Sequence, residues 1–194
     1  MSWSAAGAVY FAPRLFHIGT GSGSCAPCDR SSIPGFDRWI VGAERPSWSA
    51  ASTVGLLGLA LGSWVDLAAR DDGERSLLTS LEAAGWAVAL AEAAKAAFQR
   101  ERPVLYTADA LQAAQQEGNR RSLPSGHTAA AFAVATSYWL VAGEDRRTAK
   151  AVALGTAVGV GVLRVVARRH FPSDVVAGAA LGVGTAIVVH EIRF

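Results

Sequence analysis

The fold is decided by Ala149–Val189, which reads AKAVALGTAVGVGVLRVVARRHFPSDVVAGAALGVGTAIVV. Two apolar runs, 149–166 and 173–189, flank a short polar connection, and each run is far too long for a strand. Both are therefore predicted to be helices. Similar runs rich in Ala, Gly, Val and Leu occur at 49–69, 77–98 and 126–142. These five segments predict an all-α helical bundle.

The composition of the segments favours a membrane protein. Hydrophobic residues make up 51% of the chain and charged residues only 18%, below the ~25% of ordinary soluble chains. Each segment approaches the ~20 residues that span a bilayer. The pairs Gly155/Gly159 and Gly178/Gly182 have the spacing that suits close helix packing in lipid. A soluble all-α bundle has the same composition, but we expect a polytopic membrane protein with about five transmembrane helices.

The chain before the first long segment is different in character. Residues 17–48 are rich in Gly, Ser, Pro and Asp, which indicates a loop. Residues 1–16 hold a short apolar stretch that lacks a preceding basic region, so it is a poor signal peptide and too short to span a bilayer. We expect 1–48 to be an N-terminal loop and interfacial segment, and 49–194 to be the helical domain.

The two cysteines of the chain, Cys25 and Cys28, lie in this loop. A redox pair needs a thioredoxin-like βαβ setting, which the helical pattern lacks. Zinc needs about four ligands, and only His17 is near in sequence. A local disulfide or two unreactive thiols remain as alternatives. A disulfide would place the loop in an oxidising compartment.

The candidate catalytic and binding residues lie at the ends of the predicted helices. If the five helices alternate in direction, the ends at 98 and 166 and the starts at 126 and 173 fall on one face. Every motif described below is at one of these four ends. The net charge of +2, without a cluster of Lys or Arg, gives no footprint for nucleic acid.

Lys95 and Arg102 lie seven residues apart at the end of the second segment, and Pro103 favours an end to the helix there. Two such cations can neutralise phosphate oxygens, and arginine can bind them bidentately. The alternative for Lys95 is a side chain that extends to a membrane boundary.

Pro124-Ser125-Gly126-His127 opens the third segment. Ser125 is a good N-cap, and Gly126 lets a ligand approach the backbone closely. The free N–H groups of a helix start bind anions. The alternative is an ordinary capped helix with His127 on its surface.

Arg164 closes the fourth segment, and His170-Phe-Pro-Ser-Asp174 opens the fifth. Pro172 suits the first helical position, so Asp174 falls in the first turn. A carboxylate there can reach back to His170, hold one ring nitrogen as N–H and leave the other as a nucleophile. The alternatives are a boundary arginine and a capping carboxylate beside a loop histidine.

Together these residues suit phosphoryl transfer, which depends mainly on positioning and charge stabilisation. They do not resemble a metal cage. His17 and His190 lie outside the pattern and are given no role.

The chain resembles the type 2 phosphatidic acid phosphatase superfamily, whose signatures are Lys-x6-Arg-Pro, Pro-Ser-Gly-His and Ser-Arg-x5-His-x3-Asp. Here they run from Lys95 to Pro103, from Pro124 to His127 and from Leu163 to Asp174, with matching order and spacing. The departure is Leu163, where the family usually has serine. One hydroxyl contact to the phosphate network is therefore in doubt.

The resemblance implies a phosphatase that works through a phosphohistidine, without metal or other cofactor. His170 would attack phosphorus, Asp174 would orient it, and His127 would protonate the leaving oxygen. The phosphoryl oxygens would be bound by Lys95, Arg102, Ser125, Gly126 and Arg164.

The implied substrate is a lipid phosphate or diphosphate of the phosphatidate, phosphatidylglycerophosphate or polyprenyl diphosphate type. Neither the lipid nor the oligomeric state is readable from the residues. A soluble acid phosphatase, a vanadium haloperoxidase and an inactive membrane scaffold are the alternatives.

The distribution of Lys and Arg and the family resemblance predict opposite membrane orientations. Twelve of the 18 Lys and Arg lie on the motif face, which taken literally makes that face cytoplasmic. Membrane members of the family usually have the site outside the cytoplasm. We expect an inner-membrane, multi-pass protein with the site on the extracytoplasmic face.

Overall fold

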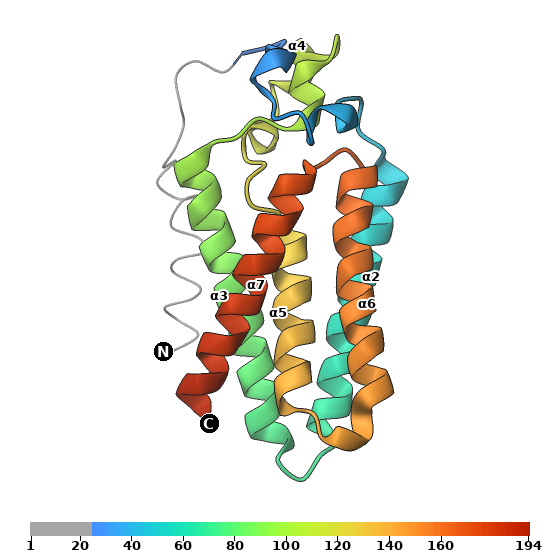
Figure 1. Cartoon of the computed structure of the whole chain (residues 1–194), viewed down its shortest axis with the longest axis vertical. Helices are drawn as coiled ribbons and strands as arrows, with labels where there is room; N and C mark the ends of the chain where they lie inside the picture. The colour runs from blue at the N-terminus through green and yellow to red at the C-terminus, as the bar shows by residue number, and fades with distance from the viewer. Residues whose placement is uncertain (1–24) are drawn as a thin grey trace.

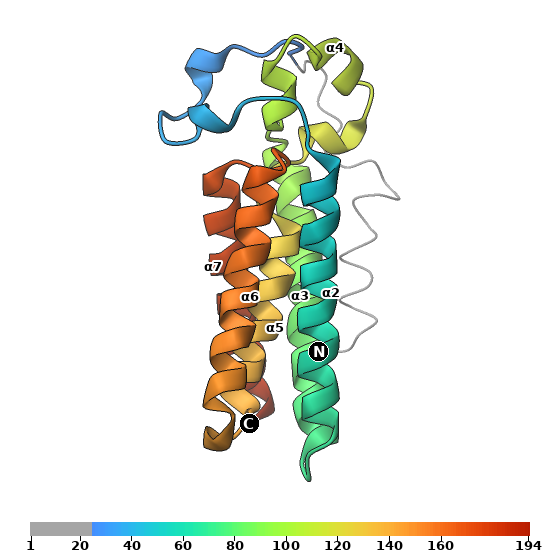
Figure 2. The same cartoon turned by 90° about the vertical axis from the view of Figure 1, so that its right-hand side faces the viewer.

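The computed structural model describes residues 25–194, so the expectations for residues 1–16 and for His17 lie outside the described residues. Five long helices form the body, and Figures 1 and 2 show that successive helices run in opposite directions. They are α2 (Pro46–Ala68), α3 (Gly73–Phe98), α5 (Gly126–Val141), α6 (Arg147–Val166) and α7 (Pro172–Arg193). The predicted all-α bundle is confirmed, with helix ends that differ from the predicted ones by at most four residues.

Local signals explain where the helices begin and end. Proline starts α2 and α7, where its missing N–H costs nothing. Ser125 caps α5 through its side-chain oxygen. After α3, Gln99 takes a left-handed conformation with φ of 45°, which turns the chain out of the helix.

Two largely irregular stretches, 25–45 and 99–125, cross one end of the bundle, and we call them the cap (Figure 1). The first contains η1 (Arg30–Ser32) and η2 (Arg38–Ile40), and the second contains η3 (Pro103–Tyr106), α4 (Ala110–Ala113) and η4 (Glu117–Arg120). A hydrophobic cluster that includes Ile33, Ile40, Leu105 and Phe171 joins both stretches to the bundle. The cap is therefore packed onto the end where the predicted motifs lie.

Helix α5 is the centre of the bundle, because it packs against all four other long helices. Its alanines at 129, 131, 133 and 135 are fully buried. On α7, a Cβ at Gly182 would lie 2.2 Å from the carbonyl oxygen of Ala129, so only glycine allows this approach. A Cβ added at Gly155 or Gly159 of α6, in contrast, would meet no described atom of another helix within 4 Å. Of the two predicted pairs, only Gly178/Gly182 packs closely within the described chain.

The outer surface of the bundle is apolar. Helices α2, α3, α6 and α7 are each long and apolar enough to cross a membrane. Their exposed large side chains include Leu57, Leu61, Val158 and Val188, which a water-facing bundle would not present in such numbers. The fifth helix, α5, has only 16 residues and is enclosed by the others. The chain is a multi-pass membrane protein.

Candidate active site

The four motif-bearing helix ends meet under the cap. Figure 1 shows that the end of α3, the start of α5, the end of α6 and the start of α7 lie at this end of the bundle. All eight residues predicted to act on a phosphate belong to these helix ends or to the connections beside them. The backbone N–H of Ser125, at the start of α5, donates to the carbonyl oxygen of Asp174, at the start of α7, over 2.9 Å. Two motifs that are distant in sequence are therefore joined directly.

His170 lies in the connection between α6 and α7 and is only 2% exposed. Its Nδ1 lies 2.8 Å from the carbonyl oxygen of Ser122. A carbonyl oxygen can only accept, so Nδ1 carries the proton and Nε2 keeps its lone pair. The nearer carboxylate oxygen of Asp174 is 3.7 Å from Nδ1. The backbone of Ser122 thus holds the ring, where the sequence predicted Asp174 to do so.

Burial lowers the pKa of His170 to about 3, because an imidazolium would lose its hydration there. The nearby carboxylate of Asp174 raises the pKa, and the charges of Arg102 and Arg164 lower it further. The balance keeps the ring neutral at neutral pH. A neutral imidazole with a free Nε2 is the form that can act as a nucleophile.

Asp174 is fully buried and accepts three hydrogen bonds besides its contact with His170. Ser122 Oγ donates to Oδ2 over 2.6 Å, and the backbone N–H of Phe171 donates to the same oxygen over 2.9 Å. Arg100 donates to Oδ1 over 2.6 Å. This carboxylate therefore stays ionised and fixes the loop that carries His170.

Arg100 connects Asp174 to a second buried carboxylate in the cap, Asp37. The second terminal nitrogen of Arg100 lies 2.8 Å from Asp37 Oδ2, and Asp37 also accepts from the backbone N–H of Ser173 over 3.1 Å. The guanidinium lies 4.4 Å from the ring centroid of Phe171. Arg100 occupies an unspecified position of the Lys-x6-Arg-Pro signature, and Asp37 lies outside all three signatures, so neither residue was given a role from the sequence.

Three cations predicted to bind phosphate are almost fully buried: Lys95, Arg102 and Arg164. Lys95 Nζ lies 2.7 Å from Glu92 Oε1. Arg164 donates to the hydroxyls of Ser49 and Ser52 over 3.0 and 3.2 Å. Leu163, which stands where the family usually has serine, directly precedes Arg164. Two hydroxyls from α2 therefore contact the arginine next to the position that lacks its usual hydroxyl.

An anion site was predicted at the start of α5. Ser125 is fully buried, and its Oγ accepts from the hydroxyl of Thr128 over 2.9 Å, which leaves its own hydrogen for another acceptor. A Cβ at Gly126 would lie 3.0 Å from Lys95 Nζ. Glycine therefore brings the lysine to the N-terminal amides of α5.

His127, one residue on, faces α2. Its Nε2 forms a 3.1 Å hydrogen bond with Thr53 Oγ1, whose hydroxyl also donates to the carbonyl oxygen of Ser49 over 3.3 Å. The Thr53 hydroxyl has one hydrogen. When it donates that hydrogen to the Ser49 carbonyl, Nε2 of His127 must be the donor in the other hydrogen bond. This contact sets the tautomer of the neutral ring, and a general acid would also need a proton on Nδ1, because only the imidazolium gives up its proton readily. Thr53 had no role in the sequence prediction.

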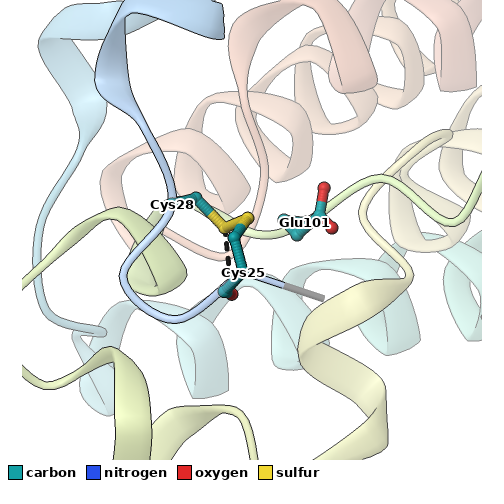
Figure 3. A group of neighbouring side chains, drawn as sticks. All are labelled: Cys25, Cys28 and Glu101. Carbon is teal, nitrogen blue, oxygen red and sulfur yellow. Dashed lines mark hydrogen bonds between the residues drawn. A yellow bond between two sulfur atoms is a disulfide. The ribbon is translucent and has the colours of Figure 1, made fainter. Parts of the chain in front are cut away.

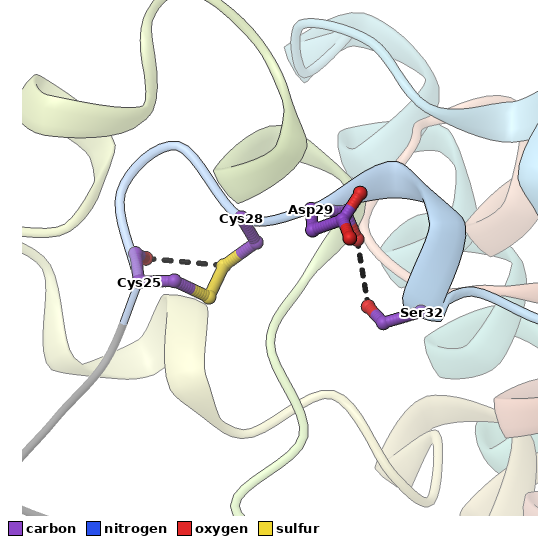
Figure 4. Close-up of a disulfide and its surroundings, with 4 residues drawn as sticks. All are labelled: Cys25, Cys28, Asp29 and Ser32. Carbon is purple, nitrogen blue, oxygen red and sulfur yellow. Dashed lines mark hydrogen bonds between the residues drawn. A yellow bond between two sulfur atoms is a disulfide. The ribbon is translucent and has the colours of Figure 1, made fainter.

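The cysteines lie in the cap, away from these residues. Cys25 and Cys28 form a disulfide, drawn in Figure 4 beside Asp29 and Ser32. Within residues 25–194, the one group of three potential metal ligands joins these two sulfurs to Glu101 (Figure 3). Because both sulfurs are bonded to each other, neither is available as a thiolate ligand. His190 lies at the far end of α7 and stacks on Phe194, outside the site.

Known proteins resemble the chain in both sequence and fold. The model of the PAP2 superfamily matches residues 76–194. A stretch of 62 residues is 44% identical to the lipid A 1-phosphatase of Porphyromonas gingivalis, over 32% of this chain but only 14% of that relative's length. The fold is similar to the crystal structure of Aquifex aeolicus LpxE, with a TM-score of 0.58 and 27% identity over 79% of this chain and 92% of that one.

Proposed function

The chain belongs to the PAP2 superfamily, and from this premise we propose that it is a metal-independent phosphatase that hydrolyses a lipid phosphate or diphosphate through a phosphohistidine. The observation that carries the proposal is the environment of His170. Its Nδ1 is held by the Ser122 carbonyl, which leaves Nε2 free, and the charges of Arg102 and Arg164 act on the ring.

Nε2 of His170 forms a bond to phosphorus while the bond to the leaving oxygen breaks, and His127 gives that oxygen its proton. Water then attacks the phosphohistidine, His127 takes the water's proton, and phosphate leaves as Nε2 regains its lone pair. The charge that develops on the phosphoryl oxygens is stabilised by Lys95, Arg102 and Arg164, together with Ser125 and the Gly126 amide.

The substrate is proposed to be a membrane lipid, because the site lies at the end of a bundle whose outer surface is apolar. The name of the Porphyromonas gingivalis relative suggests a lipid A 1-phosphate as a further candidate beside phosphatidate, phosphatidylglycerophosphate and polyprenyl diphosphate. The Cys25–Cys28 disulfide supports an extracytoplasmic site in the inner membrane, since disulfides persist in oxidising compartments.

Phosphate release by the purified protein tests the proposal across these four lipids and a soluble ester. We expect turnover of at least one lipid, no loss in EDTA and competition by vanadate, which mimics pentacoordinate phosphorus. The variant His170→Ala should form no acid-labile phosphoenzyme. Retained turnover in that variant, or strong inhibition by EDTA, would contradict the mechanism.

Three other functions predict different results. A haloperoxidase would oxidise bromide in the presence of vanadate, and a membrane scaffold would bind lipid without releasing phosphate. A soluble acid phosphatase of the same superfamily would prefer the soluble ester.

A further inference from the structure

A polar cavity of about 310 Å³ opens beside the phosphate-binding cations, a size at the lower end of small-molecule sites. Its lining comes from the end of α3, the start of the second cap stretch, and η4 with the residue that follows it. These residues are Glu92, Lys95, Arg102, Glu117, Gly118 and Arg121. The cavity extends from Glu117 and Gly118, which are exposed, to Lys95 and Arg102, each only 8% exposed.

The deep end of the cavity is prepared for an anion. Arg102 is nine-tenths buried, yet its Nε has no hydrogen-bond partner among residues 25–194. Lys95 is paired with Glu92 over 2.7 Å. A phosphoryl group bound here would supply acceptors to both cations. The rest of the cavity would then present Glu117 and Arg121 to whatever adjoins the phosphate.

Resting on the proposed phosphatase function, we propose that this cavity is a subsite for the group esterified to the phosphate, and that Glu117 and Arg121 select a sugar or polyol with free hydroxyls. A hydroxyl both donates and accepts hydrogen bonds. The carboxylate of Glu117 can accept from it, and the guanidinium of Arg121 can donate to it. A second phosphate would meet the negative charge of Glu117. A diacylglycerol moiety has no donor for that carboxylate.

The test compares three lipids with matched chain length: an acylated glucosamine 1-phosphate, phosphatidate and a polyprenyl diphosphate. Glu117→Gln and Arg121→Gln should each lower kcat/KM for the glucosamine lipid about tenfold, since each loses a hydrogen bond to a charged group. The other two lipids should change less than about twofold. Glu144→Gln and Arg147→Gln, an exposed ion pair at the opposite end of the bundle, are the matched controls.

Equal losses on all three lipids, or a loss only on the diphosphate, would overturn the subsite while leaving the phosphatase function intact. If no lipid is hydrolysed at all, the proposed function fails. The subsite is then tested by measuring ligand binding instead of turnover. For that arm, calorimetry on the 194-residue His170→Asn chain compares glucose 1-phosphate with inorganic phosphate. Tighter binding of the sugar phosphate that is lost with Glu117→Gln supports the subsite, and equal affinity for the two ligands overturns it.

Discussion

The Nδ1 atom of His170 donates to the carbonyl oxygen of Ser122 over 2.8 Å, so a backbone group holds the proposed nucleophile. Ser122 also acts through its side chain, whose hydroxyl donates to Asp174 over 2.6 Å. Ser122 thus bridges the His170 ring and the Asp174 carboxylate, two groups that were expected from the sequence to be in direct contact.

Removing the Ser122 hydroxyl should have a smaller effect than neutralising Asp174. In Ser122→Ala the carbonyl still holds His170, so we expect a fall in kcat of about tenfold or less. Asp174→Asn removes the negative charge that faces His170 and Arg100, and the fall should exceed about a hundredfold. Single-turnover measurement of phosphoenzyme formation compares the two. A larger loss in Ser122→Ala would show that the hydroxyl matters more than the carboxylate charge.

Arg100 should act as a positioning residue through Asp174. Arg100→Lys cannot serve Asp37 and Asp174 with a planar fork, so we expect kcat to fall about 10- to 100-fold with little change in KM. Arg38→Lys is the matched control, because that arginine donates only to backbone carbonyls of the cap. A change confined to KM would instead indicate that Arg100 contacts the substrate.

The hydroxyls beside Arg164 should compensate for Leu163. The double variant Ser49→Ala/Ser52→Ala removes both hydrogen bonds to the guanidinium and should lower kcat/KM about tenfold. Leu163→Ser alone should be tolerated, and added to the double variant it should restore part of the activity. Kinetics of the three variants check this, and a large loss in Leu163→Ser alone would count against it.

The two glycine pairs should respond differently to a methyl group. Gly182→Ala places a Cβ against the carbonyl oxygen of Ala129, and separating α5 from α7 should cost about 1–3 kcal/mol or more. Gly155→Ala meets open space and should be neutral or slightly stabilising, because alanine favours the helix. Thermal unfolding in detergent measures both. A similar Tm for the two variants would contradict the close α5–α7 contact.

Stability should depend on pH through His170. As pH falls below ~6.5, unfolded His170 binds a proton, whereas the folded protein binds it only near its pKa of about 3. The free energy of unfolding should therefore fall between these limits, by up to ~1.4 kcal/mol per pH unit from this group. In His170→Asn the acid-side slope should be shallower. Tm values from pH 7.5 to 4.5 in phosphate-free buffer test this, and identical slopes would refute it.

Most of the fold was predictable because its signals are local. Apolar runs of helical length lie where the helices are, and Ser125 and Pro172 mark two of the helix starts. The exact first and last residues of the helices were predicted less accurately. The chain enters α2 at Pro46 and extends α7 to Arg193, since polar residues continue a helix as well as apolar ones do.

The predicted site residues meet at one end of the bundle because their spacing places them at alternating helix ends. Arg100 was missed because its role depends on Asp37, which lies 63 residues away in a loop that shows no pattern. The carbonyl of Ser122 could not be foreseen either, since every residue has one and no side chain identifies it.

The sequence by itself determined the helices, their alternation and the motif residues, because these follow from hydrophobic runs and short spacings along the chain. Only the tertiary structure decided which groups hold those residues. The cap brings Asp37 to Arg100, α2 brings Ser49 and Ser52 to Arg164, and the loop before α5 brings the Ser122 carbonyl to His170. Such contacts depend on how separate segments pack, and neither propensity nor spacing encodes them locally.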